Sequence, residues 1–410
     1  MTCPIQLWSK KTPSKIAIKA KEFGITYSEL DALIDRSAPV SSIVAKHNLD
    51  TIASIFTTYR KGGCLHLISP HGSNFSKKND FPSFPPHHAL FLFETSGSTG
   101  SSKGVLLSGE NMHSSAEGVI DYFQLGQEHA WFLTVPLFHL SGVSILFRIF
   151  HAGGTLILNS EKSLTPALIN TASPSHISLV PTQLYRLLQS GEPLNPHIRF
   201  LIGGAETPPA LLDLANTKGH HLDLTYGMSE TASAMTIGRD NLGKPLKHRT
   251  LYIDEQGEVF VGGKVLFVGY VINQEWTPPT LTEKGLLPTR DLGKWSEEGN
   301  LEILGRKDRV IIKGGENIYP EEIERILLSL PLVEEAKVVP LRDPEYGQLP
   351  VAFIRGSTRA AIETALREKL PRFKRPSNYY QMPHYEGFKP NLKELEKLAS
   401  SEKGRATLLE

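Results

Sequence analysis

The segment ALFLFETSGSTGSSKG, residues 89–104, places a short apolar run directly before a loop of glycine, serine and threonine. Glycines let a backbone approach a ligand closely and point its N–H groups inward, while hydroxyls and the closing Lys103 are donors suited to phosphate oxygens. A Walker A loop needs four residues between its glycine and its Gly-Lys pair. Here two serines separate Gly100 from Lys103, which disfavours a P-loop kinase or GTPase. By composition alone, a flexible Ser/Gly linker explains the loop about equally well.

Around this loop, short aliphatic runs alternate with patterns of helical period. The runs predicted as strands are residues 130–137, 154–159, 176–181 and 199–204, and those predicted as helices are residues 181–190 and 208–219. Such alternation is typical of an α/β domain with a largely parallel sheet. From about residue 243 to 304 the pattern changes to short strands with Gly-rich turns, which predicts a β-rich subdomain.

A last unit is predicted from about Asp308 onward. In YPEEIERILLSL, residues 319–330, a proline stands at the helix start, acids follow in the first turn, and Ile323, Ile326 and Leu327 share one face. A strand over residues 336–341 and a second amphipathic helix over residues 360–370 follow. We therefore expect a large domain over residues 1–307 and a small α+β domain over residues 308–410.

Length, charge and cysteine content limit the function classes. A chain of 410 residues exceeds one compact core, and 44 basic against 43 acidic residues give no sign of nucleic-acid or membrane binding. The two cysteines, Cys3 and Cys64, form no disulfide framework and no metal-ligand spacing. With no signal-like N-terminus and no long apolar run, we expect a soluble cytoplasmic protein.

Three further segments carry side chains that suit a nucleotide. Residues 225–231 offer Tyr226 for stacking and Glu230 as a Mg²⁺ ligand, and residues 289–293 place Asp291 where it could accept hydrogen bonds from ribose. Residues 305–317 are charged and Gly-rich at the domain boundary. Each segment taken alone is as well explained by an ordinary turn, loop or solvated linker.

Taken in order, these segments closely resemble the adenylate-forming superfamily of acyl- and aryl-CoA ligases, peptide-synthetase adenylation domains and luciferases. TSGSTGSSKGV is similar to its phosphate loop, TYGMSET to its adenine and Mg²⁺ motif, TRDLG to its ribose motif, and GRKDRVIIKGGENIYPEEIE to its hinge. The resemblance implies that the protein activates a carboxylic acid as its adenylate, with ATP and coenzyme A as co-substrates and Mg²⁺ as cofactor. It also implies that the small domain is mobile.

The resemblance also implies a role for each site residue. It assigns the phosphates to Thr95, Ser96, Gly97, Ser98, Gly100 and Lys103, Mg²⁺ to Glu230 with Ser229 or Thr99, adenine to Tyr226 and Gly227, ribose to Asp291 and Arg306, and the hinge to Asp308. Lys389 would bridge the α-phosphate and the substrate carboxylate.

Within the superfamily the chain most resembles the o-succinylbenzoate–CoA ligases of menaquinone synthesis. VPLFHLSG, SLVPTQLYRLL, LIGGAETP and LPRFKRP carry this likeness. It implies an acid pocket with Gly203, Gly204 and Ala205 as one wall. His139 borders that pocket by resemblance, although a histidine among apolar residues is often part of the core. Arg186 could pair with a second carboxylate, and the alternative is a surface helix arginine.

Three departures from the family pattern stand out. Ser102 stands where the family usually has a proline, which predicts a more mobile phosphate loop. The stretch over residues 30–93 is short for the family, and Leu392 stands where an arginine usually follows the lysine that Lys389 matches. Two alternatives therefore stay open: an acyl or aryl ligase that loads a carrier protein, and a non-catalytic nucleotide-binding relative. The sequence does not decide whether the protein forms a homodimer.

Overall fold

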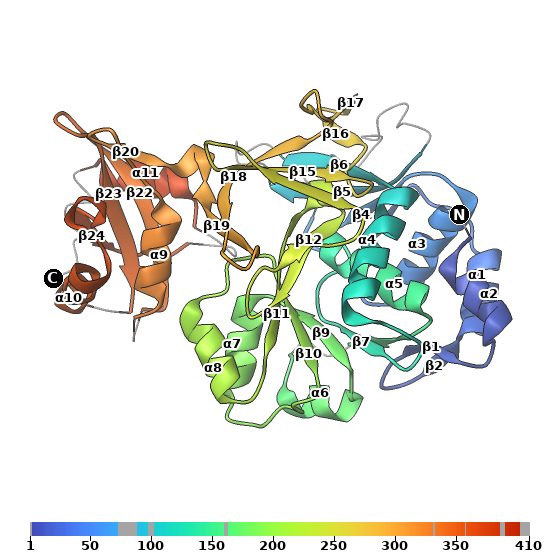
Figure 1. Cartoon of the computed structure of the whole chain (residues 1–410). Helices are drawn as coiled ribbons and strands as arrows, with labels where there is room; N and C mark the ends of the chain where they lie inside the picture. The colour runs from blue at the N-terminus through green and yellow to red at the C-terminus, as the bar shows by residue number, and fades with distance from the viewer. Residues whose placement is uncertain are drawn as a thin grey trace.

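The computed structural model describes residues 2–72, 88–96, 102–159, 163–330, 333–356, 358–385 and 390–401. The described residues form four sheets with helices over and between them, and the sheet that contains β22 and β23 lies to one side of the others (Figure 1).

The largest sheet has nine strands and a parallel centre. Its order is β13 (Lys244–Pro245), β12 (Ser233–Arg239), β11 (Leu222–Met228), β10 (Arg199–Ile202), β9 (His176–Leu179), β7 (Ala130–Leu133), β8 (Thr155–Leu158), β1 (Ile16–Lys19) and β2 (Gly24–Thr26). The six strands from β11 to β1 are parallel to their neighbours, and β13, β12 and β2 are antiparallel at the two edges. The predicted α/β class with a largely parallel sheet is confirmed.

Helices cover both faces of this sheet. Successive residues of β7 point to opposite sides, so that Trp131 packs with α4 (Gly109–Phe123) and α5 (Leu140–Ala152), while Phe132 packs with α6 (Pro166–Ala172), α7 (Pro181–Gln189) and α8 (Pro209–Thr217). α5 is almost wholly buried. None of the described helices is long and apolar enough to cross a membrane.

A six-stranded sheet packs on the far side of α4 and α5. Its order is β17 (Glu275–Thr277), β16 (Gly269–Ile272), β6 (Ser102–Ser108), β5 (Ala89–Ser96), β4 (Leu65–Ile68) and β3 (Ser42–Val44). Phe91 and Phe93 of β5 share one core with Phe147 of α5 and with α3 (Leu49–Lys61). α1 (Pro4–Lys11) and α2 (Tyr27–Arg36) complete this layer, and a capping box between Thr26 and Glu29 begins α2.

The predicted β-rich region forms a four-stranded antiparallel sheet. Its order is β14 (Arg249–Ile253), β15 (Glu258–Gly263), β18 (Leu287–Trp295) and β19 (Leu301–Arg306). Between β15 and β18 the chain leaves this sheet to add β16 and β17 to the six-stranded one.

The last sheet contains β21 (Glu316–Ile318), β20 (Ile311–Lys313), β23 (Gly347–Arg355), β22 (Glu335–Asp343) and β24 (Asn378–Gln381). α9 (Pro320–Leu328) and α10 (Arg359–Lys369) cover one face, and α11 (Leu392–Ala399) covers the other. Both helices predicted in this part of the chain are present. The domain boundary at residue 308 stays a prediction, although β19 ends two residues before it.

Candidate active site

The predicted phosphate loop joins β5 to β6. The two strands are antiparallel neighbours, with Thr95 opposite Lys103, and the Thr95 hydroxyl donates to the Lys103 carbonyl oxygen at 3.2 Å. The loop is therefore the turn of a hairpin, not the strand-to-helix turn of a Walker site. Gly97, Ser98, Thr99 and Gly100, together with the side chain of Ser96, lie outside the described residues, as does Lys389.

Glu230 and Lys103 meet although 127 residues separate them. Glu230 lies on the short turn Ser229–Thr231 that follows β11, is only 6% exposed, and accepts a hydrogen bond from Lys103 Nζ at 3.0 Å. The Tyr270 hydroxyl donates to the same Oε1 at 2.9 Å, and Lys103 Nζ lies 4.0 Å from the Tyr270 ring centroid. The loop lysine and the predicted Mg²⁺ ligand thus share one cluster, in which Glu230 is buried and Lys103 is partly exposed.

Tyr226, Asp291 and Arg306 form a second cluster. The Tyr226 hydroxyl donates to Asp291 Oδ2 at 2.7 Å, and Arg306 Nη1 donates to Asp291 Oδ1 at 3.1 Å. Burial raises the pKa of Asp291, an effect that the hydrogen bond from Tyr226 and the charge of Arg306 oppose. Burial, and then the neighbouring Asp291 carboxylate, raise the pKa of Tyr226, so the phenol is neutral at pH 7. The structure brings the residues predicted for adenine and ribose into direct contact.

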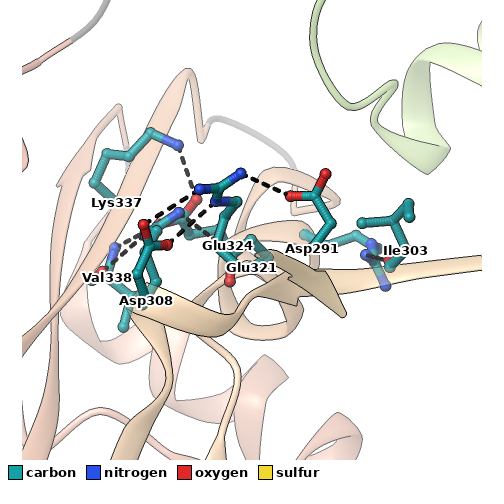
Figure 2. A network of polar contacts seen from close by, with 10 residues as sticks. Asp291, Ile303, Asp308, Glu321, Glu324, Lys337 and Val338 are labelled. Carbon is teal, nitrogen blue, oxygen red and sulfur yellow. Dashed lines mark hydrogen bonds and ion pairs between the residues drawn. The ribbon is translucent and has the colours of Figure 1, made fainter. Parts of the chain in front are cut away.

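We call the charged residues at the start of the small C-terminal part the junction network (Figure 2). Its members are Arg306, Asp308, Arg309, Glu321, Glu324 and Lys337. Arg306 bonds both Asp291 and Asp308, so the predicted hinge residue is tied to the predicted ribose site. Arg309 pairs with Glu321 at 2.7 Å and with Glu324 at 2.6 Å, which connects the residue after the predicted hinge to α9.

The predicted wall of the acid pocket follows β10. A Cβ on Gly203 would lie 2.6 Å from Cγ2 of Thr225, and Gly204 has a φ of +81°, so glycine suits both positions. Ala205 is exposed beside them. Gly227 lies against the backbone of Ser233 on β12, where a Cβ would collide with the Ser233 carbonyl. Gly203 therefore directly follows the end of β10, and Gly227 lies near the end of the neighbouring strand β11.

His139 and Arg186 have different surroundings. His139 is exposed at the residue before α5, which excludes the core alternative. Partial removal of water from its ring lowers the pKa of His139, so the imidazole is neutral at pH 7. Arg186 is exposed on α7, where a surface arginine was the alternative. The roles of both residues stay predictions.

Sequence reasoning missed Tyr270, which completes the cluster around Glu230. It lies on β16, 40 residues after Glu230, in a stretch interpreted only as part of a β-rich subdomain. No sequence motif marks it. Only the pairing of β16 with β6, which places Tyr270 opposite Val105, brings it to Lys103.

With this geometry in place, the likeness to known proteins is specific. Residues 41–271 match the AMP-binding enzyme family, and residues 322–386 match the AMP-binding enzyme C-terminal domain. The chain belongs to the AMP-binding enzyme family.

Curated relatives of this AMP-binding enzyme include two named 2-succinylbenzoate–CoA ligase. The one from Haemophilus influenzae is 35% identical over 371 residues, which cover 86% of this chain and 79% of the relative. The one from Salmonella typhimurium is 35% identical over 305 residues, which cover 73% of this chain and 66% of the relative, slightly under two thirds of its length.

A solved structure of o-succinylbenzoate CoA synthetase from Bacillus subtilis, in complex with the acyl-adenylate intermediate OSB-AMP, has a TM-score of 0.85 to this AMP-binding enzyme. It is 25% identical, and the match covers 97% of this chain and 98% of the other. The same enzyme in complex with ATP and a magnesium ion has a TM-score of 0.81, with 25% identity and coverage of 93% and 96%.

Proposed function

We propose that this AMP-binding enzyme is an AMP-forming acid–thiol ligase. It activates a carboxylic acid with ATP as an acyl-adenylate, releases pyrophosphate, and passes the acyl group to the thiol of coenzyme A. The acid is 2-succinylbenzoate in this proposal. The observation that carries the proposal is the meeting of Lys103 with Glu230 beside the group of Tyr226, Asp291 and Arg306. The names and coverage of the relatives support the choice of acid.

Glu230 suits a magnesium ion that is bound mainly through phosphate. Its Oε1 is shared by Lys103 and Tyr270, and no cluster of three or more carboxylates, histidines or cysteines suited to a metal occurs in the described part of the chain. Mg²⁺ commonly takes one or two carboxylates together with substrate phosphates and water, and this pattern fits one buried glutamate. When bound, the ion would neutralise charge on the phosphate oxygens.

The chain's own residues would position two anions and stabilise the charge that develops. Asp291 would accept hydrogen bonds from the ribose hydroxyls, and the ring of Tyr226 would stack on adenine. When ATP binds, Lys103 would donate its hydrogen bond to a phosphate oxygen in place of the Glu230 carboxylate. Lys389, predicted from the sequence, would bridge the α-phosphate and the attacking carboxylate. Catalysis of this kind depends on positioning and preorganised electrostatics.

The test is pyrophosphate release from ATP and Mg²⁺ with a panel of carboxylic acids, with and without coenzyme A. We expect release with 2-succinylbenzoate and turnover that depends on coenzyme A. Release with another acid would keep the mechanism and change the substrate, while turnover only with a carrier-protein thiol would change the acceptor. Folded protein that binds ATP but releases no pyrophosphate with any acid would overturn the proposal in favour of a non-catalytic relative.

A further inference from the structure

Tyr270 contacts both members of the Lys103–Glu230 pair. Its hydroxyl donates to Glu230 Oε1 at 2.9 Å, and its ring centroid lies 4.0 Å from Lys103 Nζ, which donates to the same Oε1 at 3.0 Å. One side chain therefore touches both the carboxylate predicted for Mg²⁺ and the cation predicted for phosphate.

The segment that carries Tyr270 is fixed around Glu230. The N–H of Phe267 donates to the Glu230 carbonyl oxygen at 2.9 Å, and the N–H of Val268 donates to the carbonyl oxygen of Leu106 on β6 at 2.8 Å. The rings of Phe267 and Tyr270 pack edge to face, with centroids 4.6 Å apart. The backbone and the side chain of Glu230 are thus both held by this one segment.

The two oxygens of the Glu230 carboxylate have different surroundings. Oε1 accepts from Lys103 and from Tyr270, whereas no donor among the described residues reaches Oε2. Carboxylates that bind metal ions are commonly oriented by a hydrogen bond from a neighbouring group, which fixes the ligand before the ion arrives. The Tyr270 hydroxyl therefore holds Glu230 in an orientation that leaves Oε2 for Mg²⁺.

Binding of ATP separates the pair, because Lys103 is predicted to donate to a phosphate oxygen. A buried charge that loses its partner is costly, and Glu230 is only 6% exposed. Tyr270 reduces this cost at both ends of the pair. Its hydroxyl continues to donate to Oε1, and its ring attracts the ammonium group without the help of the carboxylate.

We propose that Tyr270 is a positioning residue for the metal and the phosphates of the substrate: its hydroxyl holds Glu230 for Mg²⁺, and its ring holds Lys103 for phosphate. This inference rests on the proposed function and deepens it. Because the hydroxyl and the ring have separate tasks, Tyr270→Phe should weaken only the binding of the metal. Tyr270→Leu should weaken the binding of the metal and of the nucleotide.

The first experiment measures binding without turnover. The probes are Mn²⁺, followed by electron paramagnetic resonance, and α,β-methylene-ATP, which cannot be cleaved between its α- and β-phosphorus atoms, followed by calorimetry. In Tyr270→Phe, the Kd for Mn²⁺ at saturating nucleotide should rise about tenfold or more, the effect expected when a group that orients a metal ligand is lost.

Binding of the same nucleotide in EDTA tests the ring. In Tyr270→Phe this Kd should not change, because the ring beside Lys103 is kept. In Tyr270→Leu it should rise about twofold to fivefold, the factor that corresponds to a partly exposed contact between a cation and an aromatic ring.

Tyr252 on β14 is the matched control. Its side chain is 49% exposed, and Lys284 Nζ lies 6.0 Å from its ring centroid, so it has a ring and a lysine but no contact with Glu230. Tyr252→Phe and Tyr252→Leu should leave both Kd values unchanged.

A second measurement separates positioning from a purely structural role. Pyrophosphate release needs the metal and the triphosphate, whereas conversion of supplied acyl-adenylate to the thioester uses no triphosphate. Tyr270→Phe should raise the Mg²⁺ concentration for half-maximal pyrophosphate release about tenfold and leave thioester formation from the adenylate unchanged. Equal loss of both half-reactions would show a structural role and overturn the inference.

The outcomes also distinguish this inference from the function on which it rests. Wild-type protein that binds Mn²⁺ with the nucleotide, together with an unchanged Kd in Tyr270→Phe, would overturn this inference alone. Folded wild-type protein that binds no Mn²⁺ with the nucleotide would overturn the proposed function and this inference together. If Tyr270→Leu does not fold, the binding data for Tyr270→Phe decide the question.

Discussion

The junction network and Arg148, a buried arginine on α5, differ in how their charges are compensated. In the junction network each cation meets a carboxylate: Glu324, only 5% exposed, accepts from Arg309, Lys337 and the backbone N–H of Val338. Arg148 is 3% exposed, and among the described residues its guanidinium donates only to the carbonyl and hydroxyl oxygens of Ser144. The difference separates charges that are paired within the protein from a buried charge that has no counter-charge among the described residues.

The largest loss of stability is expected where an ion pair of the junction network is broken. Glu324→Ala leaves Lys337 without its acceptor and Arg309 with Glu321 as its one remaining carboxylate partner, so the small C-terminal part should lose about 3 kcal/mol of stability. Hydrogen exchange of the amides in β22 would measure this locally. Glu322 lies on α9 as Glu324 does, but it is more exposed than Glu324 and pairs with Lys374. Glu322→Ala should therefore lower the stability by less than about 1 kcal/mol. Equal effects of the two variants would refute the view that the network is a closed structural unit.

Asp291 combines a structural contact with a predicted binding role, because it forms an ion pair with Arg306 and is also predicted to bind ribose. Asp291→Asn should raise the KM for ATP about tenfold, since a charged acceptor is lost. Asp254→Asn, in the β14–β15 turn of the same sheet, is the control. An unchanged KM would leave Asp291 with a structural role only.

The pKa of Asp291 gives a second test of the same residue. Because burial raises this pKa, the carboxylate takes up its proton at a higher pH than an ordinary aspartate. The ionised acceptor is present above that raised pKa and is lost as the pH falls through it. The KM for ATP should therefore rise on acidification in the wild type and stay flat in Asp291→Asn. Parallel pH profiles of KM would contradict the assignment.

Arg148→Met should change stability little. The substitution removes a buried charge that has no counter-charge, and such replacements are often neutral or stabilising, so we expect a change within about 1 kcal/mol in thermal unfolding. A loss as large as that of Glu324→Ala would show that Arg148 is a structural cross-link, and would erase the contrast between the two regions.

The smallest effect should come from Arg325, which pairs with Glu206 and donates to the Ile303 carbonyl at 3.2 Å. The pair connects α9 to the turn after Gly203–Ala205, but both side chains are partly exposed. Arg325→Gln should cost less than about 1 kcal/mol, and 0.5 M salt should remove most of the difference in melting temperature. A large effect that salt does not change would place this pair with the junction network.

Local patterns in the sequence predicted much of the fold and part of the site. The helical period of residues 181–190 and 320–328 is set by near neighbours, so α7 and α9 could be predicted, as could the strands β7 to β10. The phosphate-binding role of residues 95–104 stays a prediction, and the sequence did not show that the two flanking strands form a hairpin, because that depends on the pairing of β5 with β6. The sequence assigned no role to Arg148, since its lack of a carboxylate partner is a property of the packed core.

Strand pairing also determines when each sheet can form while the chain is synthesised on the ribosome. In the nine-stranded sheet, Ile18 of β1 pairs with Leu156 of β8, and in the six-stranded sheet Leu106 of β6 pairs with Gly269 of β16. Neither sheet can be completed until these later strands have emerged, so one edge of β1 and one edge of β6 stay unpaired while more than a hundred residues are translated. β22 and β23 are neighbours in sequence and can pair as soon as they leave the tunnel. The part of the protein made last should therefore fold fastest, and the nascent large part is where a chaperone would be needed.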